Sequence, residues 1–373
     1  MIPSPEFQLD FLTKLQRLFS EGDFQSTYKF ALLISLSDLA VEMGHEDDRA
    51  TQIPMDLIGM KFIQLYWQQA APYSGQDLLL QNLGAQAAVV NAIAAFRRKH
   101  PGVTLISALN PKDFEDLLRT VKRTVRDQPV RYLQNLGGTT DQFLFQVDRQ
   151  GITLMPGVGY CLRRFQPLIQ QISRSRWIDH IKDNRRNFHL VRPDSDLEAF
   201  LFETPRQALS IVAKGLRKIS PRCHYCGHSM TDADVDHFIP RSLYPRDLVH
   251  NFVLAHPACN RSKSDTLASK RHLSNWLEYK EVNRDALSEV GHEAGIPGDF
   301  NSTDAVARWG YESAVNGGAQ AWIQARQYEQ IDETYLAAWS NRLIFTLNSA
   351  NNAAIVGSAA CLDSRHSRPK FAP

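Results

Sequence analysis

The sequence predicts a mainly α-helical protein of several domains, in which a small zinc-stabilised module lies between helical N- and C-terminal regions. Two observations carry this expectation. Apolar residues recur at helical spacing along most of the 373 residues, of which 43% are hydrophobic and 22% are charged, as in ordinary globular proteins. Three of the five cysteines and six of the twelve histidines gather between Cys223 and His272.

Composition, charge and the absence of long apolar runs restrict what kind of protein this can be. Lys and Arg number 42 against 40 Asp and Glu, so any nucleic-acid surface must come from local charge asymmetry. Five cysteines are an odd and sparse set that does not build a disulfide scaffold. The first residues lack a signal-peptide pattern, and no apolar run approaches the ~20 residues of a membrane span. We therefore expect a cytoplasmic protein with no membrane partner, in which paired cysteines bind metal.

Residues 1–130 are expected to form a helical N-terminal domain. Apolar residues at helical spacing predict helices over 7–19, 27–43, 54–69, 83–98 and 113–128. Asp113 stands near the start of the last helix and Pro129 lies beyond its end, as is typical of helix termini.

Residues 131–195 are expected to hold a β-hairpin followed by a basic helical segment. Apolar alternation on both sides of a polar turn predicts the hairpin over 142–155. Residues 161–192 carry eight Lys or Arg against two Asp, with aromatic residues interleaved. This pattern fits contact with a nucleic-acid backbone, and it equally fits a solvated helix face whose aromatic residues belong to the core. The candidate contacts are Arg174, Arg176, Arg185 and Arg186.

The C-terminal part of the chain is expected to return to helices. The module occupies residues 196–285, and a helical region follows over 286–348. Helical spacing predicts helices over 271–282, 304–315 and 319–331. Residues 349–373 lose this periodicity and are expected to form a flexible tail.

Two short motifs inside the module have the spacing of zinc ligands. Cys223 and Cys226 are separated by two residues, as are His256 and Cys259. Two residues between ligands allow one tight turn to aim both side chains at a single ion, and two such turns complete a tetrahedral structural Zn²⁺ site. The alternatives are that the cysteines are buried small side chains, or that His224 or His228 replaces His256. Cys161 and Cys361 have no partner at this spacing.

Residues of about 218–278 resemble the HNH (ββα-metal) endonuclease family. The resemblance rests on the two cysteine motifs, on Asp236-His237 followed by Pro240, on the segment NFVLAHPACN and on Lys263 beyond it. It implies strands near 232–240 and 250–255, a helix from about 257, and an endonuclease that hydrolyses DNA phosphodiester bonds.

The resemblance also implies roles for individual residues. His237 would be the general base, Asn251 would brace the loop that presents it, and Asn260 would complete the catalytic set. Asp236 and Asn260 would hold a catalytic Mg²⁺ or Mn²⁺, since their oxygen atoms are hard ligands. Arg241, Arg261 and Lys263 would contact phosphate. Asp236 as a turn residue and Asn251 as a cap are the simpler readings of those two residues.

The chain departs from the family pattern at two positions. The second cysteine motif begins with His256, and Asn260 stands where the family more often has histidine. Helical domains joined to such modules in prokaryotic proteins suggest restriction or anti-phage defence, with a protein partner or regulator on the helical regions. A non-catalytic zinc ribbon that binds nucleic acid or acts as a scaffold is the alternative. A nuclease held inactive by its acidic first fifty residues is a third hypothesis.

Overall fold

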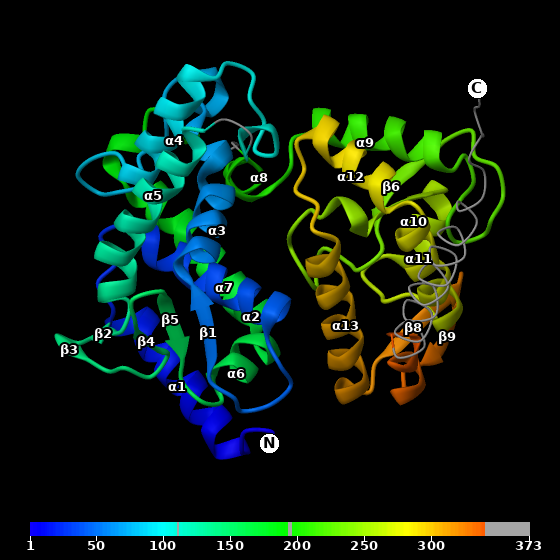
Figure 1. The fold of residues 1–373 in the computed structure, drawn as a ribbon, viewed down its shortest axis with the longest axis horizontal. Coiled ribbons are helices and arrows are strands. Elements are labelled where there is room, and N and C mark those ends of the chain that lie inside the picture. The colour runs from blue at the N-terminus through cyan, green and yellow to red at the C-terminus, as the bar shows by residue number, and fades with distance from the viewer. Residues whose placement is uncertain (110–111, 193–195, 340–373) are drawn as a thin grey trace, which may run out of the picture.

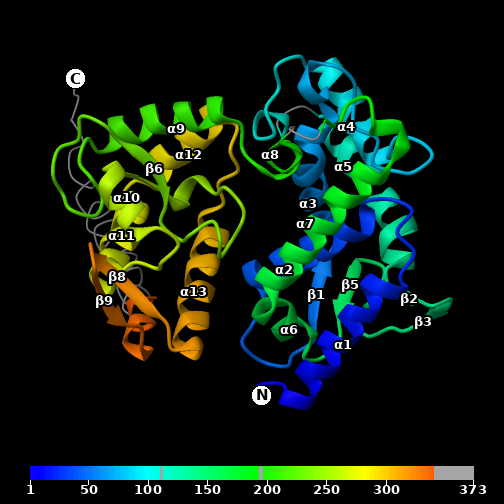
Figure 2. The ribbon, with the colours of Figure 1, turned by 180° about the vertical axis from the view of Figure 1, so that it is seen from behind.

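The computed structural model describes residues 1–109, 112–192 and 196–339. The chain forms two halves that lie side by side, as Figure 1 shows and as the reverse view in Figure 2 confirms. One hydrophobic core runs from Phe11 to Leu201 and defines the N-terminal domain. A second core extends from Val212 to Trp339, with Val41 as its one member from the N-terminal domain, and defines the C-terminal half. The predicted flexible tail, residues 349–373, lies outside the described residues.

The N-terminal domain is built mainly from helices, as the sequence predicted. A three-stranded antiparallel sheet in the order β1-β5-β4 and a short β2–β3 ladder complete it. The hairpin expected over 142–155 is β4–β5, and β1 is a third strand that the sequence did not indicate. The elements are α1 Pro5–Glu21, α2 Tyr28–Met43, β1 Thr51–Pro54, α3 Met55–Trp67, α4 Ala88–Lys99, α5 Phe114–Val125, β2 Asn135–Leu136, β3 Thr139–Thr140, β4 Phe145–Val147, β5 Gly151–Leu154, α6 Val158–Arg164, α7 Gln166–Asp183 and α8 Leu197–Phe202.

Helix α2 is the central helix of the molecule. Every residue from Tyr28 to Val41 is buried, so the helix has no solvent-exposed stripe along most of its length. It packs against α3, α6 and α7 of its own domain and against α13 of the C-terminal half. Val41 belongs to the second core while the other buried apolar residues of α2 belong to the first. Helix α2 therefore joins the two halves.

The C-terminal half contains a ββα module with helices on both sides in sequence. Strands β6 and β7 pair antiparallel, with Asp236 opposite Val253 and His237 opposite Phe252. Strands and helix fall where the resemblance implied. The elements are α9 Arg206–Ile219, β6 Asp234–His237, β7 Phe252–Ala255, α10 Pro257–Lys263, α11 Lys270–Val282, α12 Arg284–Ala294, α13 Phe300–Gly317, β8 Gln320–Gln324 and β9 Gln327–Gln330.

One predicted helix is wrong. Residues 319–331 form the antiparallel β8–β9 hairpin, whose turn contains Arg326 in the left-handed region at φ 62°. The hairpin docks through its backbone, because Trp322 N–H donates to Leu267 and Ser269 N–H donates to the Trp322 carbonyl. These bonds to a distant segment outweigh the local helical spacing.

Candidate functional site

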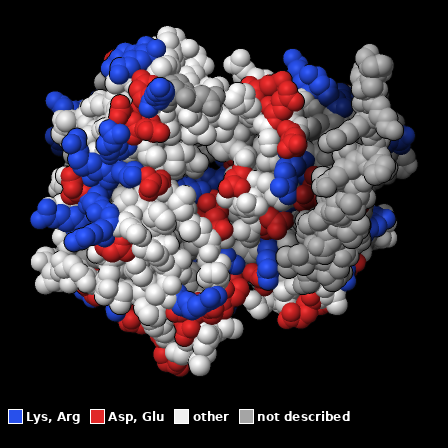
Figure 3. Space-filling view, viewed as in Figure 1, with Lys and Arg blue, Asp and Glu red and all other residues white. Residues whose placement is uncertain are grey.

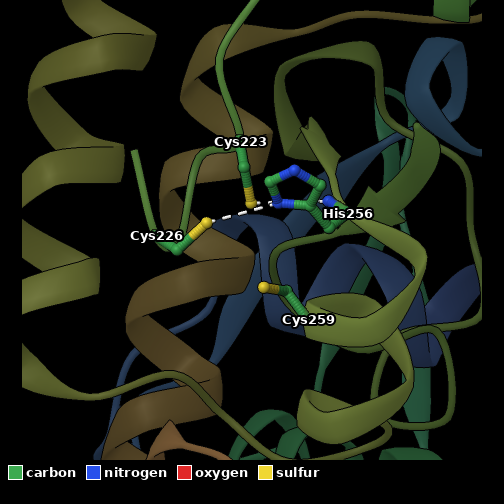
Figure 4. A group of neighbouring side chains, drawn as sticks. All are labelled: Cys223, Cys226, His256 and Cys259. Atoms are coloured by element: carbon green, nitrogen blue, oxygen red, sulfur yellow. Dashed lines mark hydrogen bonds between the residues drawn. The ribbon is translucent and has the colours of Figure 1, made fainter. Parts of the chain in front are cut away.

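The side chains of Cys223, Cys226, His256 and Cys259 converge on one point. The cysteine pair comes from the loop between α9 and β6, and the second pair comes from the end of β7 and the first turn of α10 (Figure 4). One ligand atom from each residue lies within 4.8 Å of all the others. Three sulfur atoms and one imidazole nitrogen in such a cluster fit a structural zinc ion.

The groups around this cluster orient its histidine and lower the pKa of a thiol, and both effects favour a bound cation. The Nε2 of His256 lies 3.2 Å from the Ser229 carbonyl, which fixes the ring so that Nδ1 faces Cys226 Sγ at 3.3 Å. Burial raises the pKa of the Cys223 thiol, but hydrogen bonds from the backbone of Cys226 and His256 outweigh it and lower the pKa to about 7. A thiolate is the form that binds zinc.

The two competing histidines do not enter the cluster. His224 packs its ring against Tyr225, Phe238 and Tyr279, and burial lowers its pKa to about 3, so the ring is neutral inside the core. His228 is exposed and is not among the clustered residues.

The acidic side chains of β6 point toward α10. Asp234 and Asp236 are two residues apart on the strand, so they share one face of the hairpin, and His237 lies on the other. Asp236 is 7% exposed, and its Oδ2 accepts a hydrogen bond of 2.5 Å from Tyr225 and lies 3.3 Å from the Lys263 ammonium. A carboxylate has two oxygens and about four acceptor sites, so Oδ1 remains able to meet a cation.

Asn260 contacts Asp234, an acid that was not among the predicted metal ligands. Its amide Nδ2 donates to Asp234 Oδ2 at 3.2 Å, which leaves the amide oxygen as a potential ligand. Asp234, Asp236 and Asn260 therefore offer oxygen atoms from β6 and α10, the donor type that Mg²⁺ and Mn²⁺ prefer. Asp234 could have been identified from the sequence, because it lies two residues before Asp236 and therefore on the same face of the strand.

Lys263 is not placed to contact phosphate. Its side chain has an exposed fraction of 0%, and its ammonium donates to the His237 carbonyl at 3.0 Å besides pairing with Asp236. Burial lowers the pKa of Lys263 below its usual value, and the charge of Asp236 offsets only part of this effect. The helical spacing correctly placed Lys263 beside Asn260, but that face of α10 turns inward toward β6.

His237 is held from two sides. Its ring packs edge-on against Phe252 with centroids 4.8 Å apart, and its Nε2 lies 2.5 Å from Asp247 Oδ1. Asn251 braces the backbone beyond it, since its amide donates to the Ile239 carbonyl at 2.9 Å and accepts from Ile239 N–H at 2.8 Å. Asn251 is 3% exposed, which fits a bracing residue.

Asp247 is a second residue that the sequence analysis missed. Burial raises the pKa of its carboxyl, but the hydrogen bond and charge of His237 outweigh that effect and lower the pKa to about 2. Arg241 Nε lies 3.9 Å away. The carboxylate is thus ionised at neutral pH. Asp247 lies ten residues after His237, outside the Asp-His motif, and the fold of the intervening loop brings the two side chains together.

The predicted nucleic-acid contacts differ in their surroundings. Arg261, Arg176, Arg185 and Arg186 are exposed. Arg174 and Arg241 instead line a cleft of about 700 Å³ between α7, α8 and the segment 241–245. Arg174 donates to the Pro245 carbonyl at 2.7 Å, and Arg241 pairs with Glu203 at 3.0 Å.

A further basic surface covers α4 and α5. Figure 3 shows Lys and Arg gathered along the outer side of the N-terminal domain, at the left. The last turns of these helices contribute Arg97, Arg98, Lys99, Lys122 and Arg123. This surface was not predicted from the sequence, because its basic residues come from two helices that are separated along the chain.

Comparisons with known families agree with this geometry. Residues 223–266 match the family described as HNH endonuclease, and the ββα module is therefore an HNH endonuclease domain. Residues 9–194 match a family described as a domain of unknown function (DUF8808), which corresponds to most of the N-terminal domain. Comparison with curated proteins and with solved structures found no match. Among the described residues, every helix is too short or too polar to cross a membrane.

Proposed function

We propose that the protein is a metal-dependent endonuclease that hydrolyses DNA phosphodiester bonds, with His237 as the general base. An HNH domain supports nuclease activity in general. The observation that carries the specific proposal is the arrangement at the end of β6, where Asp247 and Phe252 hold the His237 ring and Asn251 braces Ile239 two residues beyond. A partly exposed neutral imidazole accepts a proton from water near neutral pH.

Each residue of the site has a separate role that follows from the chemistry of its side chain. His237 takes the proton of the attacking water, and Asp236 and Asn260, with Asp234 beside them, would hold a divalent cation. Such a cation, when bound, would neutralise the scissile phosphate and stabilise the leaving oxygen. Arg261 is exposed on α10 directly after Asn260 and is suited to a neighbouring phosphate. The Cys3His cluster fixes the fold and takes no part in the chemistry.

The alternative of a non-catalytic zinc ribbon makes no use of these residues. A ribbon needs the four zinc ligands but neither the buried Asn251 brace nor an oriented His237. The pathway, for which restriction or anti-phage defence is the expectation, depends on what the N-terminal domain binds.

Cleavage of supercoiled plasmid with Mg²⁺ or Mn²⁺ tests the proposal. The wild-type protein should nick or linearise the plasmid, and His237→Ala should slow cleavage by about 10²- to 10⁴-fold, the contribution of a general base. A matched control is His292→Ala, which removes an exposed histidine from the last turn of α12. Equal cleavage by a folded, zinc-containing His237→Ala protein would falsify the mechanism, and RNA run in parallel identifies the preferred nucleic acid.

A further inference from the structure

We infer that Asp247 is the positioning residue of the base His237, and that the N-terminal domain holds the loop that carries it. The inference rests on the proposed function, because it assigns a partner to the residue proposed to activate water. We call residues 244–247 the positioning loop.

The contact between Asp247 and His237 determines which ring nitrogen is free. Asp247 Oδ1 lies 2.5 Å from Nε2, so Nε2 carries the hydrogen and donates it to the carboxylate. The other nitrogen, Nδ1, is then the atom that accepts a proton from water. Because Phe252 packs against the ring, the imidazole cannot rotate freely away from this orientation.

The carboxylate is itself constrained. The Asp247 side chain is 9% exposed, whereas that of His237 is 20% exposed. The acid is thus the more buried member of the pair, and part of the imidazole surface remains open to solvent. An ionised carboxylate behind an imidazole also stabilises the imidazolium that forms when the base takes its proton.

The residues preceding Asp247 are anchored in the N-terminal domain. Tyr244 donates to Glu42 at 2.6 Å, and Arg246 pairs with Asp38 at 2.9 Å; both acids lie on α2. On α7, Gln170 accepts from Arg246 at 3.3 Å. A series of contacts thus links α2 to the positioning loop and, through Asp247, to His237.

Steady-state cleavage by the full-length zinc protein tests the inference. Asp247→Asn keeps the shape of the side chain but removes its charge. We expect kcat to fall roughly 10- to 100-fold, the range found for partners that orient a functional histidine, with KM nearly unchanged. In the His237→Ala background the same substitution should change the rate by less than about twofold, because the group it positions is gone. Asp285→Asn, an exposed carboxylate in the first turn of α12, is the matched control and should behave as wild type.

The outcomes separate this inference from the proposed function. A wild-type protein that cuts, together with an Asp247→Asn variant of equal kcat, overturns the positioning role alone. A loss of equal size in both backgrounds also overturns it, since that pattern indicates a structural role. No cleavage by the wild-type protein overturns the proposed function and this inference with it.

A measurement on the wild-type protein covers the case in which Asp247→Asn does not fold. An imidazole N–H bonded to a buried carboxylate gives a proton resonance far downfield in the NMR spectrum. We expect such a resonance, and we expect it to vanish in His237→Ala and to persist in the His292→Ala control. Its absence from the wild-type spectrum would contradict the contact on which the inference depends.

Discussion

Asn251 uses both ends of its side-chain amide on one backbone residue. Ile239 is fully buried, and its N–H and carbonyl both bond to Asn251. Asn251→Ala leaves both groups without a partner in the core, and each such group costs about 1–3 kcal/mol. We therefore expect the free energy of unfolding to fall by roughly 2–4 kcal/mol, measured by denaturant titration.

The control for this prediction is Asn283→Ala. Asn283 makes one side-chain bond, to the Tyr279 carbonyl at the end of α11, at a partly exposed position. It should cost clearly less stability than Asn251→Ala. Equal losses of stability would show that the two hydrogen bonds to Ile239 contribute no more than the single bond of Asn283.

At the same scale, the sequence indicated which residues belong to the site more reliably than it indicated what each side chain contacts. It placed Asn260 and Lys263 on one face of a helix, and they do share it. It could not tell that this face turns inward, where Lys263 meets Asp236 instead of solvent. Asp234 escaped notice because its role depends on a contact with Asn260 across two elements.

Among the elements, those with strong local signals were predicted well. The helices α1, α2, α3 and α5 and the hairpin β4–β5 follow from apolar spacing and from turn residues. The β6–β7–α10 unit followed from the family resemblance rather than from its short strands. Strands β8 and β9 were predicted as a helix, because their turn has Arg326 where a glycine or asparagine would have signalled a hairpin.

A zinc ion on the cysteine motifs would hold the ββα unit together, because so short a segment buries little core by itself. Cys226→Ser should release zinc and lower the melting temperature of the C-terminal half. Elemental analysis should find close to one zinc per wild-type chain and close to none in the variant. Cys161→Ala is the matched control: this cysteine is buried in the first core, far from the cluster in sequence, and its loss should leave the zinc content intact. Full zinc retention by Cys226→Ser would exclude the four-ligand site.

For the whole molecule, the contact between the two halves includes buried polar pairs besides the apolar contact of Val41. Asp38, 1% exposed, accepts from Arg246 of the C-terminal half and from Gln170 at 2.8 Å. Arg163, 5% exposed, pairs with Glu312 at 3.2 Å and with Glu46 at 2.6 Å. The last of these joins the acidic first fifty residues to the basic 161–192 stretch, but Arg163 is engaged inside the protein and is not a surface for nucleic acid.

Asp38→Ala should be strongly destabilising. It leaves the Arg246 charge partly buried without its partner, a change that typically costs about 3–5 kcal/mol. We expect a loss of that size in denaturant titration and slower plasmid cleavage, because the positioning loop loses its anchor. The control is Asp116→Ala, which removes one partner of the exposed Arg119 pair and should have little effect. Unchanged stability in Asp38→Ala would show that the interface does not hold the loop.

This arrangement of the halves could not be predicted from the sequence. Asp38 and Arg246 are separated by more than half the chain, and their pairing has no local periodicity or motif. The expected domain boundaries at 130 and 195 therefore remain predictions, although residues on both sides of 130 share one core. Asp247 was missed although it lies only ten residues from His237, because no periodicity or motif predicts a contact across an irregular loop.

Helix α2 has a consequence for how such proteins can be recombined. It contributes Val41 to the second core and two acids to the positioning loop. In a chimera that joins the HNH domain to an unrelated N-terminal domain, the positioning loop would lose its contacts with α2, even if the zinc ligands and His237 were intact. The two halves are thus expected to be inherited and exchanged as a unit, with α2 as the part that a graft must bring along.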